Sequence, residues 1–307
     1  TADTDITATD FETVTIDTGS YSTATAQLVN AVNVGTNALV LTGSNGLTTT
    51  ATTGIITAAT IDASALTGAL VMNVAAATGV TSITGGSAAD TLVGDAASTI
   101  SGGAGNDTIT GGSGNDTLNG DAGNDTIVTG AGTDTVNGGA GDDTLSFVGD
   151  LSALDVIDGG EGTDTLNINN ASIATIKALT ISEANTFNTN MTNVEKVSVS
   201  NAWDQTTFDM GYLAGVTNLT LNGLTGAESI VGFTSGSTIT VADDLTAVLT
   251  MSVNSAVTST TDALTLVLAK SADEDYTSIV LPDVETLTVN VTEVTASTTI
   301  QAATIGL

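Results

Sequence analysis

Seven aspartates recur at one fixed place in a repeated stretch of the chain, and they are the residues best suited to chemistry. Five of them follow one another every nine residues, from Asp107 to Asp143, in glycine-rich segments such as GGAGNDTIT at 102–110. Ionised Asp offers hard oxygen donors, and the chain contains no His and no Cys that could add nitrogen or sulfur donors. The full set is Asp90, Asp107, Asp116, Asp125, Asp134, Asp143 and Asp164. Binding chemistry at these positions therefore depends on oxygen alone.

The aspartates occupy position six of a nine-residue repeat. Positions one, two and four are mostly Gly, position seven is mostly Thr, and position eight is Leu, Ile or Val. The glycines predict a turn, because they adopt positive φ and allow close backbone approach, and the following residues predict a short strand with its apolar side chain inward. Two turns and two strands complete a coil of about 18 residues, so each Asp is expected to stack over the Asp two repeats later.

Stacked carboxylates repel one another unless a cation lies between them. The predicted turn also aims several backbone carbonyls inward, and these need partners. About six carboxylate and carbonyl oxygens suit Ca²⁺ better than Mg²⁺ or Zn²⁺, and this repeat pattern is that of a calcium-binding β-helix. The sequence therefore predicts several bound calcium ions.

Residues 85–167 resemble the RTX (repeat-in-toxin) nonapeptide array. The resemblance implies a right-handed parallel β-roll, calcium-dependent folding and export by type I secretion. It also implies that the aspartates bridge successive turns while carbonyls of the first four loop positions complete the calcium shell. Those carbonyls belong to Gly102, Gly103, Ala104, Gly105, Gly111, Gly112, Ser113, Gly114, Gly120, Asp121, Ala122, Gly123, Thr129, Gly130, Ala131, Gly132, Gly138, Gly139, Ala140 and Gly141.

Three irregular copies limit the array at its ends. Asp90 has Ala88 in place of the fourth-position Gly, and the eight-residue copy at 94–101 has no Asp, which predicts a poor or empty site beside Asp116. A 12-residue insert, 147–158, separates Asp164 from the regular copies. Asp164 is therefore expected to stand apart, with Asp155, Asp158 or Glu161 completing a separate site.

The flanks predict further strands. Alternating segments such as DFETVTID (10–17) and DVETLTVN (283–290) recur at intervals of roughly 20 residues, which is typical of half-buried strands. We expect an all-β, parallel β-solenoid in three parts: 1–84, the calcium-binding roll 85–167, and 168–307 with an irregular or helical insertion near 181–215. A β-sandwich is the alternative that such short strands also permit.

Composition excludes several classes of function. With 34 Asp+Glu against three Lys and no Arg, the net charge is −31, so neither nucleic acid nor an anionic membrane surface is an expected partner. No apolar run is long enough for a membrane span. Without His or Cys, the chain cannot form a Ser-His-Asp triad, a Cys nucleophile or a His-bound zinc. We therefore expect no enzyme.

Two smaller sets of residues outside the repeats have alternative interpretations. Acidic clusters at Asp3/Asp5/Asp10, Asp204/Asp209, Asp243/Asp244 and Asp273/Glu274/Asp275 are either extra calcium sites or solvated turns. Trp203, Phe208 and Tyr212 form either a contact surface for protein or sugar, or a plug over the solenoid core, and we favour the plug.

The Thr- and Ala-rich flanks resemble calcium-dependent surface-layer (S-layer) proteins of Gram-negative bacteria. This resemblance implies a secreted, structural protein that self-associates into a two-dimensional lattice on the cell surface, with any contact to surface polysaccharide made by a region outside this chain. The alternatives are an RTX adhesin of biofilms, or the non-catalytic RTX portion of a type I secreted exoprotein.

Overall fold

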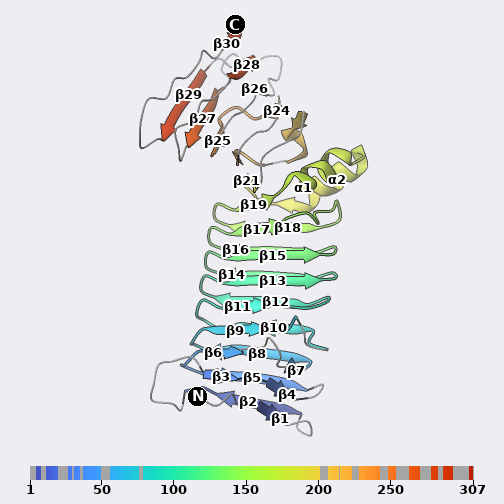
Figure 1. Ribbon diagram of the computed structural model, residues 1–307, viewed down its shortest axis with the longest axis vertical. Helices are drawn as coiled ribbons and strands as arrows, with labels where there is room; N and C mark the ends of the chain where they lie inside the picture. Colours follow the sequence, from blue (N-terminus) through green and yellow to red (C-terminus); the bar gives the residue numbers. More distant parts are fainter. Residues whose placement is uncertain are drawn as a thin grey trace. The chain divides into compact units, whose positions relative to one another are not determined.

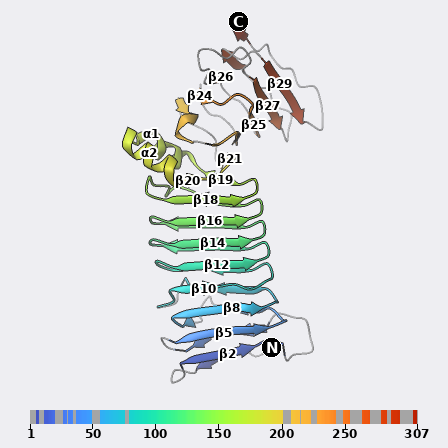
Figure 2. The same cartoon turned by 180° about the vertical axis from the view of Figure 1, so that it is seen from behind.

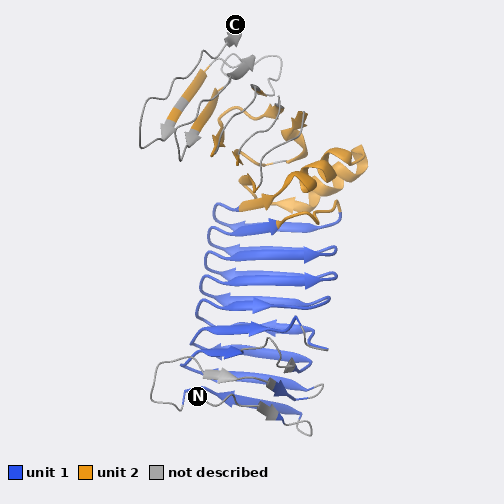
Figure 3. Cartoon of the chain, viewed as in Figure 1, with its two compact units in different colours: residues 1–146, 154–164 blue, residues 147–153, 165–307 orange. Residues whose placement is uncertain are grey.

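The computed structural model divides the chain into two compact units. Unit 1 comprises residues 1–146 and 154–164, and unit 2 comprises residues 147–153 and 165–307 (Figure 3). The residues described are 5–7, 12–19, 27–29, 31–34, 37–49, 56–75, 79–200, 207–213, 215–222, 228–242, 248–253, 263–269, 278–282, 286–292 and 304–306. The division predicted at residue 85 rests on the sequence pattern; unit 1 includes residues on both sides of it, and the division stays a prediction.

Unit 1 is a parallel β-solenoid whose strands stack as successive rungs (Figure 1). One sheet, facing the viewer in Figure 2, contains β2 (Thr13–Asp17), β5 (Ala38–Gly43), β8 (Thr60–Leu66), β10 (Ser82–Thr84), β12 (Thr99–Ala104), β14 (Thr117–Ala122), β16 (Thr135–Ala140) and β18 (Val156–Glu161). A second sheet contains β3 (Gln27–Val29), β6 (Leu47–Thr49), β9 (Leu70–Asn73), β11 (Thr91–Val93), β13 (Thr108–Ser113), β15 (Thr126–Ala131) and β17 (Thr144–Phe147). A small third sheet joins β1 (Asp5–Thr7), β4 (Ala31–Asn33) and β7 (Ile56–Thr57).

The repeat sequence accounts for this arrangement residue by residue. Position eight fills the interior, and its members from Leu92 to Leu145 are at most 1% exposed. Position seven carries a Thr that faces solvent on most rungs. The pairing of Ile100 with Leu118, and of Leu118 with Val136, stacks identical positions on one another. Each coil thus adds one buried branched side chain to a column beneath each sheet. The alternation of this buried residue with outward-facing neighbours is the two-residue period of a half-buried strand.

Coil length is regular only within the repeats. Hydrogen bonds between equivalent repeat positions there join residues 18 apart, as from Asp107 to Asp125. In the flanks, Thr81 bonds to Ala59 over 22 residues and Asn222 bonds to Val199 over 23. The parallel ladder therefore tolerates coils of different length, and longer connections leave its register intact.

Unit 2 is also built from parallel strands. One set of strands paired side by side consists of β19 (Thr165–Ile168), β21 (Lys196–Val199), β23 (Asn218–Leu221), β25 (Ser237–Val241), β27 (Ala263–Ala269) and β29 (Thr286–Thr292). Another contains β22 (Thr207–Asp209), β24 (Glu228–Phe233), β26 (Val248–Val253), β28 (Ser278–Pro282) and β30 (Thr304–Gly306). The two-residue strand β20 is Met191–Thr192.

Two α-helices interrupt the strands of unit 2. Helix α2 (Ile181–Asn190) lies in the predicted insertion and begins with a capping box, in which Thr180 and Glu183 bond each other's side chain and backbone. Helix α1 (Asn170–Ala178) lies outside the predicted insertion, and the Asn169 side chain caps it by accepting the Ser172 N–H. A 3₁₀ turn, η1, covers Met210–Tyr212.

The predicted fold class is confirmed. Every pair of strands whose register is described runs parallel, for example β12 with β14 and β25 with β27, whereas a sandwich of the immunoglobulin type is antiparallel. Among the described residues, no helix has the length and apolar character needed to cross a membrane.

Candidate metal centre

The position-six aspartates of unit 1 form two rows, one on each edge of the coils. In the first row, the backbone N–H of each Asp donates to Oδ1 of the next, at 2.7 Å from Asp90 to Asp107, from Asp107 to Asp125 and from Asp125 to Asp143, and at 2.8 Å from Asp143 to Asp164. In the second row the Ser98 N–H donates to Asp116, Asp116 to Asp134, and Asp134 to Asp155. Within each row, the carboxylates of successive coils lie at the same edge, as the 18-residue period predicts.

Asp164 does not stand apart, contrary to the sequence-based expectation. It continues the first row 21 residues beyond Asp143, and Asp155 continues the second row 21 residues beyond Asp134. Residues 147–158 are therefore one lengthened repeat, and their last four residues, Asp-Val-Ile-Asp, supply position six and the buried Ile157 of position eight. Alignment on the aspartate and the apolar residue, rather than on the glycines, would have revealed this from the sequence.

The second carboxylate oxygen, Oδ2, distinguishes the aspartates from one another. In Asp107, Asp116, Asp125 and Asp143 it is buried and has no hydrogen-bond partner among the described residues. These four side chains are at most 2% exposed. An ionised oxygen in this state is costly, by about 1–3 kcal/mol or more for a buried group left unsatisfied, so each of the four marks a place for a cation.

Asp90 is different because both of its oxygens accept protein N–H groups. Oδ1 accepts from Leu70 and Oδ2 accepts from Gly86, each at 2.7 Å. Asp90 therefore closes the first row at its N-terminal end with each of its two oxygens held by a backbone N–H, and a Cβ on Gly85 would meet both Asp90 Oδ2 and the Gly102 carbonyl.

The four remaining Oδ2 atoms face a gap in the β-ladder at position one. Register pairs continue on both sides of this position, for example Asn119 with Asn137 and Asp121 with Gly139, but position one itself is passed over. A Cβ added to Gly120 would meet Asp125 Oδ2 and the Gly138 carbonyl at under 3.0 Å, closer than real Cβ atoms come. Glycine thus keeps open a cradle in which one carboxylate oxygen and one carbonyl oxygen converge.

The same cradle recurs on both edges of the roll. Its members are Gly102 with Asp107 and the Gly120 carbonyl, Gly111 with Asp116 and the Thr129 carbonyl, Gly120 with Asp125 and the Gly138 carbonyl, and Gly138 with Asp143 and the Gly159 carbonyl. Positions two and four have positive φ in the regular turns, and at position two Asp121 adopts it as well (φ 72°). Their glycines build the turn, whereas the position-one glycine leaves room.

Of the expected loop carbonyls, those of position one are the ones seen to face the carboxylates. Carbonyls of positions two and three accept ladder hydrogen bonds, as when Ala104 N–H donates to Gly86 and Gly105 N–H donates to Ala122. A carbonyl oxygen has two lone pairs, so these bonds leave capacity for a second partner.

A second ladder at position five was not anticipated. The Asn106 side chain accepts the Asn124 N–H, and the Asn124 side chain accepts the Asp142 N–H, at 2.9 and 3.1 Å. Here the later coil donates to the earlier one, the reverse of the direction in the aspartate rows. The Asn-Asp pair of the repeat therefore clamps each turn to both of its neighbours, and Asn at position five is its sequence signal.

Burial raises the pKa of most of the aspartates in the two rows. Desolvation raises the pKa of Asp90, Asp116, Asp125 and Asp143, against backbone hydrogen bonds that lower it. For Asp107, desolvation and then the nearby charges of Asp90, Asp125 and Asp121 outweigh the hydrogen bond from the Asp90 N–H and raise the pKa to about 7. The protein alone therefore does not stabilise these carboxylates as anions.

The cradles fit calcium by their donor chemistry. Within the part of the chain that the structure describes, no three or more acidic side chains gather around one point, so a metal must also draw on main-chain oxygens. Carboxylate and carbonyl oxygens are the ligands that Ca²⁺ prefers, and its variable coordination number suits a shared row. Bound calcium would supply the positive charge that the buried Oδ2 atoms lack.

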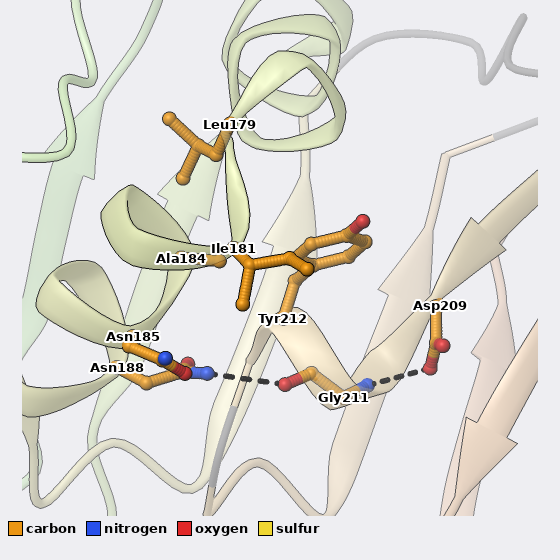
Figure 4. Close-up of a pocket in the computed structure, with 8 residues that line it drawn as sticks. All are labelled: Leu179, Ile181, Ala184, Asn185, Asn188, Asp209, Gly211 and Tyr212. Atoms are coloured by element: carbon orange, nitrogen blue, oxygen red, sulfur yellow. Dashed lines mark hydrogen bonds between the residues drawn. The ribbon is translucent and has the colours of Figure 1, made fainter.

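Unit 2 has a separate recess of about 310 Å³ between α2 and η1 (Figure 4). Asn188 Nδ2 donates to the Gly211 carbonyl at 3.1 Å, while Asp209 Oδ1 accepts the Gly211 N–H at 2.9 Å. Phe208 is 1% exposed and its ring centroid lies 6.1 Å from that of the half-buried Tyr212. Phe208 thus contributes to the core, as the plug interpretation requires.

The structure describes neither the backbone nor the side chain of most of the other candidate residues, and for one of them it describes the backbone alone. The residues outside the described ranges are Trp203, Asp204, Asp3, Asp10, Asp243, Asp244 and 273–275. For Asp5 the backbone is described and the side chain is not.

Replacement of Asp125 by Asn is expected to remove one bound calcium. Asn keeps an acceptor for the Asp107 N–H but loses the charge and replaces one of the two carboxylate oxygens by an NH₂ group. Loss of about 1.5–3 kcal/mol, as for a charge-assisted interaction, should raise the calcium concentration for half-maximal folding about two- to fourfold, because folding is coupled to about four ions and the loss is divided among them. Asp142→Asn is the matched control, because Asn stands at this exposed position in three other repeats and likewise accepts a backbone N–H of the next coil. Equal calcium content in wild type and Asp125→Asn, measured by metal analysis of dialysed protein, would contradict the assignment.

Comparison with known proteins agrees with this geometry. A family model described as the RTX calcium-binding nonapeptide repeat (4 copies) matches residues 95–127, 110–145 and 154–167. Searches among curated proteins and among solved structures found no match to the chain. RTX repeats are typically found in secreted or extracellular proteins, and their β-roll is typically structural rather than catalytic. The central part of this chain is an array of RTX calcium-binding nonapeptide repeats folded as a parallel β-roll.

Proposed function

We propose that this chain is a calcium-dependent structural protein of the bacterial exterior, and that it forms the lattice-building region of a surface layer. The observation that carries the proposal is the set of buried Oδ2 atoms of Asp107, Asp116, Asp125 and Asp143, which face carbonyls and have no other described partner. A fold that buries anionic oxygens in this way depends on a cation for its stability.

The proposed mechanism is a folding switch driven by calcium. Extracellular calcium modules bind at about 10⁻⁴ to 10⁻³ M, so the chain stays unfolded at the low calcium of the cell interior and folds after export. Binding energy at a site that the unfolded chain lacks becomes folding energy. The net charge of −31 keeps the metal-free chain extended, and calcium removes part of that repulsion.

Self-association into a two-dimensional lattice is the finer part of the proposal. It is supported by the Thr- and Ala-rich solenoid strands on both sides of the repeats and by the lack of His and Cys, which removes the common catalytic groups. Surface polysaccharide would be bound by a region outside this chain.

Imaging of purified protein with and without calcium tests the lattice. We expect ordered two-dimensional sheets when millimolar calcium is added and their loss on chelation. Dispersed monomers in calcium would overturn the lattice proposal. If such monomers bound a glycan or a receptor, the result would favour an adhesin, and if they bound neither, the non-catalytic portion of a secreted exoprotein.

A further inference from the structure

The two aspartate rows are not equivalent at position one. In the first row, Gly102, Gly120 and Gly138 each leave the cradle open beside Asp107, Asp125 and Asp143. In the second row, Gly111 does so only beside Asp116, because the next position one is Thr129. Thr129 has the one β-branched side chain at this position among the regular copies.

Thr129 faces two turns at once and acts differently toward each. Its carbonyl oxygen enters the cradle of Gly111, where it converges with Asp116 Oδ2. Its side chain extends toward the following coil, is fully buried, and donates from Oγ1 to the Ser146 carbonyl at 3.2 Å. A Cβ at the equivalent Gly120 would meet the carboxylate oxygen and the facing carbonyl at under 3.0 Å. The Thr129 side chain thus takes the volume in which a cation would contact Asp134.

On the N-terminal side of Asp116, the turn at Gly94 has room for a cation but lacks a carboxylate to bind it. At Gly94 the cradle is open, but the oxygen that faces the Gly111 carbonyl is the hydroxyl of Ser98. Ser98 Oγ also accepts the Asp95 N–H at 3.2 Å. A neutral hydroxyl in place of a carboxylate removes the charge that makes such a site attractive to calcium.

We infer that the two edges of the roll bind calcium unequally: the cradles of Asp107, Asp125 and Asp143 form a continuous series on one edge, while Asp116 holds a single ion on the other. Thr129 and Ser98 close the neighbouring positions of the second row on either side of Asp116. This inference rests on the proposed binding of calcium by the roll, and it names the turns that do not take part.

The calcium content of the purified chain tests the inference. Thr129→Gly opens the cradle beside Asp134, so the folded variant should bind one calcium more than the wild type and show a higher thermal midpoint in saturating calcium. Thr129→Val is the matched control, since it keeps the bulk and removes only the hydroxyl; its calcium content should equal that of the wild type. Extra calcium in Thr129→Val, or none in folded Thr129→Gly, overturns the inference.

Ser98→Asp gives an independent test at the other end of the row. It restores a carboxylate beside the open Gly94 cradle and should also add one calcium, so the inference is decided even if Thr129→Gly does not fold. No added calcium in Ser98→Asp overturns it. A wild-type chain that binds no calcium at all would instead overturn the proposed function, and the two failures are therefore distinguished by the wild-type measurement.

Discussion

Removal of calcium is expected to unfold at least residues 85–167 and to abolish assembly. At free calcium of about 100 times Kd, each site contributes about 2.7 kcal/mol of stability. Four cradles together therefore contribute on the order of 10 kcal/mol, comparable to the whole stability of an ordinary domain, about 5–15 kcal/mol. Loss of the ions also leaves four buried oxygens unmet. We expect the β-signal in circular dichroism to fall on chelation and to return when calcium is restored.

Amide hydrogen exchange would locate this change. The N–H groups of Asp107, Asp116 and Asp125 donate to the aspartates of the next coil and are protected in the folded roll. They should exchange rapidly after chelation. Magnesium is the control ion, because it demands a small octahedral shell and dehydrates reluctantly. An unchanged spectrum and unchanged exchange in a verified metal-free sample would contradict calcium-dependent folding.

Acidification is expected to restore structure to the metal-free roll. Burial raises the pKa of Asp90, Asp107, Asp116, Asp125 and Asp143 above that of an exposed Asp, for Asp107 to about 7. Groups whose pKa is raised on folding favour the folded state fully below their unfolded pKa of about 3.9, and that contribution is lost as pH rises through the folded value. The free energy of unfolding of the metal-free roll should therefore increase as pH falls from 7 toward 4.

A pH titration of dialysed, metal-free protein followed by circular dichroism measures this effect. Asp62 acts in the opposite direction, because hydrogen bonds from the Ser64 side chain and backbone lower its pKa, but its effect lies below the tested range. With calcium present, protons compete for the same oxygens and the calcium affinity should fall over the same range. A metal-free β-signal that weakens between pH 7 and pH 4 would contradict the raised pKa values.

The periodic part of the fold could be predicted because its contacts repeat at one sequence separation. Position six of one repeat meets position six two repeats later, so spacing alone places Asp107 beside Asp125. The columns of buried branched residues at position eight follow from the same period. Local rules were sufficient where each coil has the same length.

The remaining features depend on contacts for which no fixed spacing exists. Closure of the first row at Asp90 requires the Leu70 N–H, which a flanking coil supplies from 20 residues away. The place of Asp155 is obscured by a turn that has lost its glycines. Helix α1 depends on the Asn169 cap and on burial of Ile173 and Ile176, in a segment that also reads as alternating. In each case packing decided between local alternatives that the sequence left nearly equal.

The unequal coil lengths have a consequence for how the chain tolerates insertions and deletions. The strands keep their ladder across separations of 18, 21 and 22 residues. The sheet therefore does not enforce the nine-residue spacing, and it is the turn, with its carboxylate five residues after the open glycine, that does so. Loss or gain of a single residue should be absorbed by a flanking coil. In the turns between Gly102 and Asp143 the same change would separate a carboxylate from its cradle. The length of these turns is therefore fixed by the need to bind a cation and not by the pairing of the strands.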